Sequence, residues 1–288
     1  MKLITKKMPV DFNLFLFGDT HEGTRLFFDG AFDTFIDTLC SPYDGLSASR
    51  NFCVHHGDAI EAVTVDDKRF DPGTVVDPRG TPFDQAKSQI KRLWPIKDKL
   101  LCLLMGNHEL ALRKFGNLSK VMADELGVPY GTYAAKITYV DHKGELIFKH
   151  YLTHGRKSIT STADDPKRRK TNMELILKRQ LKFKAGDALL MSKGHTHKLL
   201  VCEPNSELYL TDDGGKLHQN YTHSRRNAGY IHPDHRWYVN TGSFYLGSLI
   251  DEVGYAEAFE YDPLETGYAV CLVRDRIIVD VKRCVVAG

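Results

Sequence analysis

Five short polar segments carry residue types that can bind a metal ion. Each combines a carboxylate, an amide or an imidazole with a neighbouring glycine, and each directly follows an apolar run of the chain. Oxygen and imidazole ligands of this kind suit manganese, iron, zinc or nickel. The residues are Asp19 and His21 in GDTH, Asp58 in GD, Asn107 and His108 in GNHE, His154 in THG, and His195 and His197 in GHTH.

Taken one at a time, these segments predict little. A lone Asp-x-His pair occurs often by chance. An isolated histidine is more often a surface residue or a hydrogen-bonded core residue than a metal ligand. A metal site therefore follows only if the fold brings the five segments together.

The apolar runs predict buried strands that carry the polar residues at their C-terminal ends. Segments with helical spacing lie between these runs, so strands and helices interleave along the chain. This order favours an α/β fold with mixed sheets, in which ligands gather at strand ends. The other expected elements are helices over 23–40, 83–97 and 118–127, a hairpin over 133–155, a basic helix over 164–187, and two last strands over 267–273 and 276–286.

We expect the whole chain, residues 1–288, to form a single domain with two insertions. One insertion lies near 60–82, in a stretch rich in Asp, Pro and Gly that predicts a surface excursion. The other lies near 203–236 and is expected to be irregular. No internal repeat and no low-complexity linker divides the sequence.

Composition places the chain among ordinary globular proteins. Hydrophobic residues make up 42% and charged residues 26% of the sequence, which suggests neither a disordered nor a fibrous protein. The net charge of +2 identifies no nucleic-acid partner by itself. Six cysteines without a CxxC pair predict a reduced, cytoplasmic protein, and no apolar run is long enough to predict a membrane span.

In their order along the chain, the five segments resemble the pattern of the calcineurin-like metallophosphoesterase superfamily. That pattern is D-x-H, G-D, G-N-H-[DE], a lone H and G-H-x-H, and it runs here from Asp19 to His197. The resemblance implies two mixed β-sheets packed as a sandwich and flanked by α-helices. It also implies a hydrolase acting on phosphoric ester bonds, with two divalent metal ions in a cleft at the strand ends.

The same resemblance gives each matching residue a role. A hydroxide that bridges the two metal ions would be the nucleophile, and His108 would protonate the leaving oxygen. Manganese is the first expectation for the metal ions, with iron, zinc, nickel or magnesium as alternatives. Glu109 either orients a neighbouring residue of the metal site or is a solvated loop residue. The implied ligands are Asp19, His21, Asp58 and His197 for the first metal ion, and Asp58, Asn107, His154 and His195 for the second.

The sequence narrows the substrate class. Protein phosphatases of the superfamily carry arginines beside the second and third blocks, where this chain has GDAIEA and Met105. Purple acid phosphatases lack the first histidine, which this chain keeps as His21, and need a tyrosine after the second block. With these two classes disfavoured, the sequence favours a phosphodiesterase or nuclease. The alternatives are a phosphomonoesterase acting on a small molecule or phosphoprotein and, in another class, a non-catalytic binding scaffold of the same fold.

A basic segment between the fourth and fifth blocks fits a nucleic-acid substrate, because a row of cations can neutralise the phosphates of a strand. The same segment also fits a solvated amphipathic helix with Leu175, Ile176 and Leu181 packed inward. Its candidate substrate-binding residues are Lys167, Arg168, Arg169 and Lys170.

Aromatic and basic residues also gather in the late insertion. They can stack bases or cap the cleft, as in proteins that bind single strands, or they can belong to an ordinary loop. These residues are Tyr221, His223, Arg225, Arg226, Tyr230, His232, His235, Arg236 and Trp237.

Overall fold

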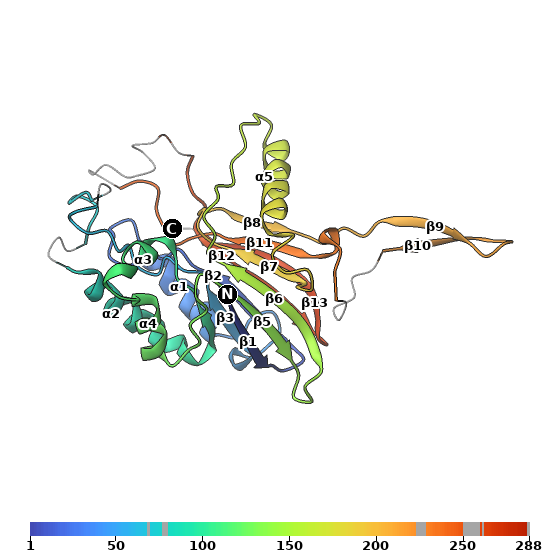
Figure 1. Cartoon of the computed structure of the whole chain (residues 1–288), viewed down its shortest axis with the longest axis horizontal. Helices are drawn as coiled ribbons and strands as arrows, with labels where there is room; N and C mark the ends of the chain where they lie inside the picture. The colour runs from blue at the N-terminus through green and yellow to red at the C-terminus, as the bar shows by residue number, and fades with distance from the viewer. Residues whose placement is uncertain (68–69, 77–79, 223–228, 250–259, 261, 287–288) are drawn as a thin grey trace.

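Two mixed β-sheets form the centre of this computed structural model (Figure 1). It describes residues 1–67, 70–76, 80–222, 229–249, 260 and 262–286. The first sheet has the strand order β13 (Ile277–Val285), β12 (Gly267–Arg274), β2 (Phe12–Phe17), β3 (Asn51–His55) and β4 (Leu100–Leu103). The second has the order β1 (Lys2–Lys7), β5 (Ala134–Val140), β6 (Leu146–Thr153), β7 (Leu190–Lys193), β11 (Trp237–Thr241) and β8 (Leu199–Cys202).

The strands that carry the polar segments run parallel within each sheet. In the first sheet, β2, β3 and β4 are parallel neighbours. In the second sheet, β6 and β7 are parallel neighbours. Parallel neighbours end at the same edge of a sheet, so the loops that follow these strands emerge together.

Helices cover the outer faces of the two sheets. Alternate residues of β2 explain this arrangement, because Leu14 and Leu16 pack into the core between the sheets while Phe15 and Phe17 pack against helices. All six residues of β2 are buried, as expected for a strand covered on both faces. The helices are α1 (Asp29–Cys40), α2 (Pro82–Leu93) and α4 (Leu118–Leu126) on the first sheet, α5 (Pro166–Leu181) on the second, and the short α3 (Asn107–Ala111).

Several expected elements are confirmed. The segment 133–155 forms the antiparallel pair β5 and β6. Pro82 opens α2, and the preceding Thr81 caps the helix by exchanging hydrogen bonds with Asp84. Mixed sheets with interleaved helices confirm the α/β class. Short 3-10 turns cover Ala48–Arg50, Trp94–Lys99, Arg113–Phe115 and Pro233–His235.

Other expectations are corrected. The helix expected from residue 23 begins only at Asp29, because Thr24 and Phe27 form β-bridges to Val75 and Tyr245 that hold the chain out of the helix. The late insertion, expected to be irregular, contains the antiparallel hairpin of β9 (Leu208–Asp212) and β10 (Leu217–Tyr221). The sequence favours a strand over the whole run ALLMSKGHTH, but β7 ends at Lys193 and both histidines lie beyond it.

Two further properties concern the whole described chain. No helix among the described residues is long and apolar enough to cross a bilayer. All six cysteines are described, and none of them forms a disulfide.

One ion-pair cluster joins the turn before β7 to two neighbouring strands, and it yields a stability prediction. Burial alone would raise the pKa of Asp187, but hydrogen bonds from Lys136 and Lys149 outweigh it and lower the pKa to about 2. Changing Asp187→Asn should lower the free energy of unfolding by about 1–2 kcal/mol at pH 7. Because the folded pKa is depressed, this contribution disappears as the pH falls from about 4 to about 2. Urea denaturation across this range measures it, and a pH-independent difference contradicts it.

Candidate metal centre

The polar residues that follow β2, β3, β4, β6 and β7 lie together in one cluster. Their ligand atoms form three overlapping groups, and within each group the atoms lie within 4.8 Å of one another. His21 and Asp58 each belong to two groups, so the groups form one continuous site. Buried carboxylates and imidazoles at these distances can hold metal ions. The groups are Asp19, His21 and His197; His21, Asp58 and His108; and Asp58, His154 and His195.

The backbone of the cluster is strained. Non-glycine residues in the left-handed region cost about 1–3 kcal/mol each, and they gather at functional sites. The resulting sharp turns explain how His195 and His197, two residues apart, both reach the cluster after β7 has ended. The cluster residues with positive φ are Asp19 (51°), His21 (51°), Asp58 (48°), His195 (74°) and His197 (51°).

Two glycines are needed where the backbone approaches the carboxylates. A Cβ added at Gly106 would lie 1.9 Å from Oδ1 of Asp58. A Cβ added at Gly194 would lie 2.7 Å from Oδ2 of Asp19. Real Cβ atoms do not approach oxygen atoms this closely, so the glycines of GNHE and GHTH make room for the ligand carboxylates.

In the group of Asp19, His21 and His197, a hydrogen bond to Glu61 orients the ring of His21. Nδ1 of His21 lies 2.8 Å from Oε2 of Glu61, which can only accept when ionised, so Nδ1 carries the proton. Nε2 of His21 therefore faces Nε2 of His197, at 3.1 Å. Burial opposes protonation of His21, but the bond to Glu61 raises its pKa to about 9. Burial holds the pKa of His197 well below its ordinary value.

In the group of Asp58, His154 and His195, a hydrogen bond orients the ring of His154 in the same way. Nδ1 of His154 donates to the carbonyl oxygen of His56 at 2.9 Å, which leaves Nε2 facing Oδ1 of Asn107 at 2.9 Å and Oδ2 of Asp58 at 3.2 Å. Burial opposes protonation of His154, but the Asp58 charge raises its pKa to about 9. Burial and the neighbouring His154 lower the pKa of His195 to about 4.

The two carboxylates of the cluster are buried and accept backbone hydrogen bonds. Asp19 accepts from the N–H of His195, at 2.9 Å, and Asp58 accepts from the N–H of His108, also at 2.9 Å. Burial raises the pKa of Asp19 to about 7. Burial acts on Asp58 as well, but the charges of His154 and His108 outweigh it and hold the pKa well below 3.8. The centre thus combines two buried carboxylates with imidazoles that can carry positive charge.

His108 lies at the open side of the cluster. Its side chain is 12% exposed, against 3% for His21. Nδ1 of His108 donates to the carbonyl oxygen of Glu61, which can only accept, so a neutral His108 carries its proton on Nδ1 and not on Nε2. Because His108 also belongs to a metal-capable group with His21 and Asp58, the geometry permits either a ligand or a proton donor at this position.

Glu61 and Tyr245 gain roles that the sequence did not reveal, and the structure decides between the two alternatives for Glu109. Glu61 orients both His21 and His108, as described above. Tyr245 packs its ring against His21 and His197, with centroid distances of 5.0 and 5.1 Å. Glu109 is buried, and it accepts from the N–H groups of Ala59 (2.6 Å), Ile60 (3.2 Å) and Gly106 (2.8 Å). The solvated alternative for Glu109 is therefore wrong: this carboxylate ties the loop after β3 to the loop after β4.

The four candidate substrate-binding residues, Lys167 to Lys170, lie on the first turns of α5, outside the cluster. Arg169 donates to the carbonyl oxygens of Ala163 and Asp164, just before the helix. Lys170 lies 3.7 Å from Glu174 on the same helix. The amphipathic interpretation holds for Leu181, which is buried, but not for Leu175, which is 57% exposed.

The basic and aromatic residues of the late insertion differ in burial and in their contacts. Arg236 is fully buried, and its guanidinium donates to the carbonyl oxygens of Lys182 (2.9 Å) and Gly186 (3.0 Å). It therefore fixes the end of α5 and is not exposed for stacking on a base. Trp237 is also buried. His223, Arg225 and Arg226 lie outside the described residues.

No protein-family model matches the sequence, and no curated protein sequence matches it significantly. The functional interpretation therefore depends on the residues and the geometry of the cluster.

The group that contains His197 and the group that contains His195 predict separate losses of metal. His197→Ala should remove chiefly the metal ion held with Asp19 and His21, and His195→Ala chiefly the one held with Asp58 and His154. Each variant, reconstituted with Mn²⁺, should retain one bound ion fewer than the unchanged protein by elemental analysis. His142→Ala changes an exposed histidine of the DHKG turn and should have no effect. Unchanged metal content in both ligand variants would contradict the assignment.

Metal affinity should rise with pH. With pKa values near 9, His21 and His154 are protonated at neutral pH in the metal-free protein, and both must lose a proton to bind a metal ion. The affinity for Mn²⁺ should therefore increase between pH 6 and 8.5, by about tenfold per pH unit for each proton displaced. Calorimetric titration in buffers of different ionisation enthalpy counts the released protons. A pH-independent affinity contradicts the prediction.

Proposed function

We propose that this chain is a metal-dependent phosphodiesterase of the calcineurin-like metallophosphoesterase fold. One observation carries the proposal. Three overlapping metal-capable groups, each with a carboxylate and two histidines, lie at the ends of strands from both sheets. Asp58 belongs to two of these groups, and its carboxylate lies 3.8 Å from Nε2 of His21 and 3.2 Å from Nε2 of His154. A carboxylate in this position can bind to two metal ions at once.

The donor set supports two divalent metal ions, with Mn²⁺ as the first choice. Buried carboxylates need compensating positive charge, and the orienting bonds leave Nε2 of His21 and His154 as the inward atoms. Asn107 adds a neutral oxygen beside His154. Metal ions held by these residues would lower the pKa of a coordinated water and withdraw charge from the phosphoryl group.

Within this proposal, His108 is the proton donor. Its Nδ1 donates to the carbonyl oxygen of Glu61, so Nε2 carries a proton only when the ring is the doubly protonated cation. In that form Nε2 gives its proton to the leaving oxygen as the ester P–O bond breaks, while the attacking water bonds to phosphorus and loses a proton to solvent. His108 later regains a proton from solvent. A positioned histidine of this kind contributes about 10²–10⁴-fold to the rate.

A diester substrate fits the neighbours of the cluster better than a monoester. A phosphomonoester carries nearly two negative charges and benefits from additional cationic side chains. At the positions where protein phosphatases carry arginines, this chain has Ala62 and Met105, both buried. The exposed Lys167 and Arg168 at the start of α5 favour a nucleic-acid strand among the diesters.

The test is hydrolysis of bis(p-nitrophenyl) phosphate and of a labelled single-stranded oligonucleotide in the presence of Mn²⁺. The unchanged protein should cleave both, and chelation should abolish cleavage. Asp58→Ala should reduce the rate to the chelated level, and His108→Ala should reduce it by about 10²–10⁴-fold with metal content retained.

His142→Ala serves as the matched control, because it removes an exposed histidine and should leave the rate unchanged. Thermal melting of each variant shows whether the fold is intact. Cleavage that persists in both site variants and after chelation would overturn the proposal. A much faster turnover of p-nitrophenyl phosphate than of the diester would favour the monoesterase alternative.

A further inference from the structure

A continuous chain of hydrogen bonds crosses the buried interior between the two sheets. It runs through four fully buried side chains, Tyr139, His150, Ser192 and His56. The first three lie on the neighbouring strands β5, β6 and β7 of the second sheet, and His56 directly follows β3 of the first sheet. Oγ of Ser192 lies 2.6 Å from Nε2 of His56 and 2.6 Å from Nε2 of His150. The Tyr139 hydroxyl lies 3.3 Å from Nδ1 of His150 and completes the chain.

The carbonyl oxygen of Phe17 fixes the direction of every bond in this chain. A carbonyl can only accept, so Nδ1 of His56, which lies 3.1 Å away, carries a proton. Burial lowers the pKa of His56 to about 4 and holds the pKa of His150 well below its ordinary value, so both rings are neutral at pH 7. Nε2 of His56 then accepts from the hydroxyl of Ser192. Oγ of Ser192 in turn accepts from Nε2 of His150, so the two histidines have opposite tautomers.

Stability alone does not require a chain of this kind. Replacing hydrogen-bonded partners in a core by apolar groups of similar shape is often neutral or even stabilising. Removing one member, by contrast, leaves its neighbour buried without a partner, so a complete chain holds all of its members in place. The chain from Tyr139 to His56 is complete, and it therefore fixes the group at its end.

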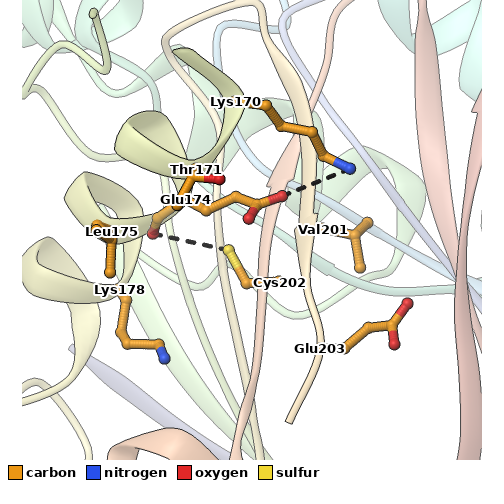
Figure 2. Close-up of a pocket in the computed structure, with 8 residues that line it drawn as sticks. All are labelled: Lys170, Thr171, Glu174, Leu175, Lys178, Val201, Cys202 and Glu203. Atoms are coloured by element: carbon orange, nitrogen blue, oxygen red, sulfur yellow. Dashed lines mark hydrogen bonds and ion pairs between the residues drawn. The ribbon is translucent and has the colours of Figure 1, made fainter. Parts of the chain in front are cut away.

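The outer face of the second sheet carries a separate set of polar contacts. Figure 2 shows a groove of about 310 Å³ between α5 and β8, where Lys170 lies 3.7 Å from Glu174. In the same view, Sγ of Cys202 donates to the carbonyl oxygen of Glu174 at 3.7 Å. None of these residues belongs to the metal-capable groups. The inner chain differs, because it reaches a residue of such a group.

This connection is made by the backbone of His56. Its carbonyl oxygen accepts the N–H at Nδ1 of His154 at 2.9 Å, which leaves Nε2 of His154 facing Asn107 and Asp58. His56 also precedes Asp58 by only two residues. The place of His56 therefore influences both the orientation of one candidate ligand and the start of the loop that carries another.

We propose that Ser192 and His150 are positioning residues of the metal centre. Through the ring of His56 they hold the carbonyl group that orients His154. Their effect on metal binding rests on the proposed metal centre, whereas the direction of the chain and its hold on His154 do not depend on a metal ion.

Nuclear magnetic resonance of the isotope-labelled, metal-free protein tests the direction of the chain. Long-range nitrogen–hydrogen correlation spectra distinguish the two tautomers of a neutral imidazole. His56 should carry its proton on Nδ1, and His150 should carry its proton on Nε2. The same tautomer in both rings, or the reverse pair, would overturn the proposal.

Ser192→Ala tests the positioning role, because it removes the hydroxyl that links the two rings. In the metal-free protein, the N–H at Nδ1 of His154 should exchange with solvent about tenfold faster than in the unchanged protein. The affinity for Mn²⁺, measured by calorimetric titration, should fall by about tenfold or more. Ser192→Cys fills nearly the same space with a much weaker hydrogen-bonding group, and it should change both quantities in the same direction.

Val273→Ala is the matched control. Val273 is fully buried in the core between the sheets, but it pairs with Phe12, at the end of β2 that lies away from the metal centre. This variant should melt at a lower temperature and keep the exchange rate at His154 and the affinity for Mn²⁺. If the exchange rate at His154 is unchanged in both Ser192 variants, or rises equally in Val273→Ala, the positioning role is wrong.

Failure of this inference and failure of the proposed function give different results. An unchanged protein that binds no Mn²⁺ would contradict the metal centre and the phosphodiesterase, while the tautomers and the exchange at His154 would still decide the positioning role. A protein that binds Mn²⁺ equally well with and without the Ser192 hydroxyl would contradict the role in metal binding.

Discussion

Two buried carboxylates connect the parts of the candidate metal centre. Asp19 follows strand β2 of the first sheet and accepts a hydrogen bond from the N–H of His195, which follows strand β7 of the second sheet. Asp58 accepts the N–H of His108 and lies close to His154. A buried carboxylate without donors or a counter-charge is very unfavourable, so the loops must remain where these carboxylates are satisfied. The relative position of the two sheets and the position of the imidazoles thus depend on the same bonds.

The sandwich supplies the rigidity that this arrangement requires. Left-handed backbone at Asp19, Asp58 and His195 is unfavourable locally, and it persists only where the surrounding structure fixes it. The core between the sheets and the helices outside them fix the strand ends. The buried carboxylate of Glu109 then ties together the loops that carry Asp58 and Asn107. Packing free energy from the layers therefore offsets the strain at the centre.

The metal centre and the late insertion make different demands on the fold. The metal centre lies where strands from both sheets end, and its residues are mostly buried. The hairpin of β9 and β10 consists almost entirely of exposed residues of the late insertion. An insertion outside the sandwich can change without disturbing the strand ends, so the hairpin and the metal centre can vary independently.

The sequence by itself determined which residues could form the centre. Apolar runs ending at GDTH, GNHE and GHTH are local patterns, and strand burial and ligand chemistry both follow from local residue types. Only the tertiary structure decided the roles of Glu61 and Tyr245, because their partners belong to other loops and no local pattern marks such contacts. The structure also decided between the two roles that the sequence left open for Glu109, which accepts the N–H of Ala59 in another loop. It also decided that residues 208–221 pair as an exposed hairpin. That segment is short and partly polar, so its pairing depends on cross-strand contacts that apolar periodicity alone does not predict.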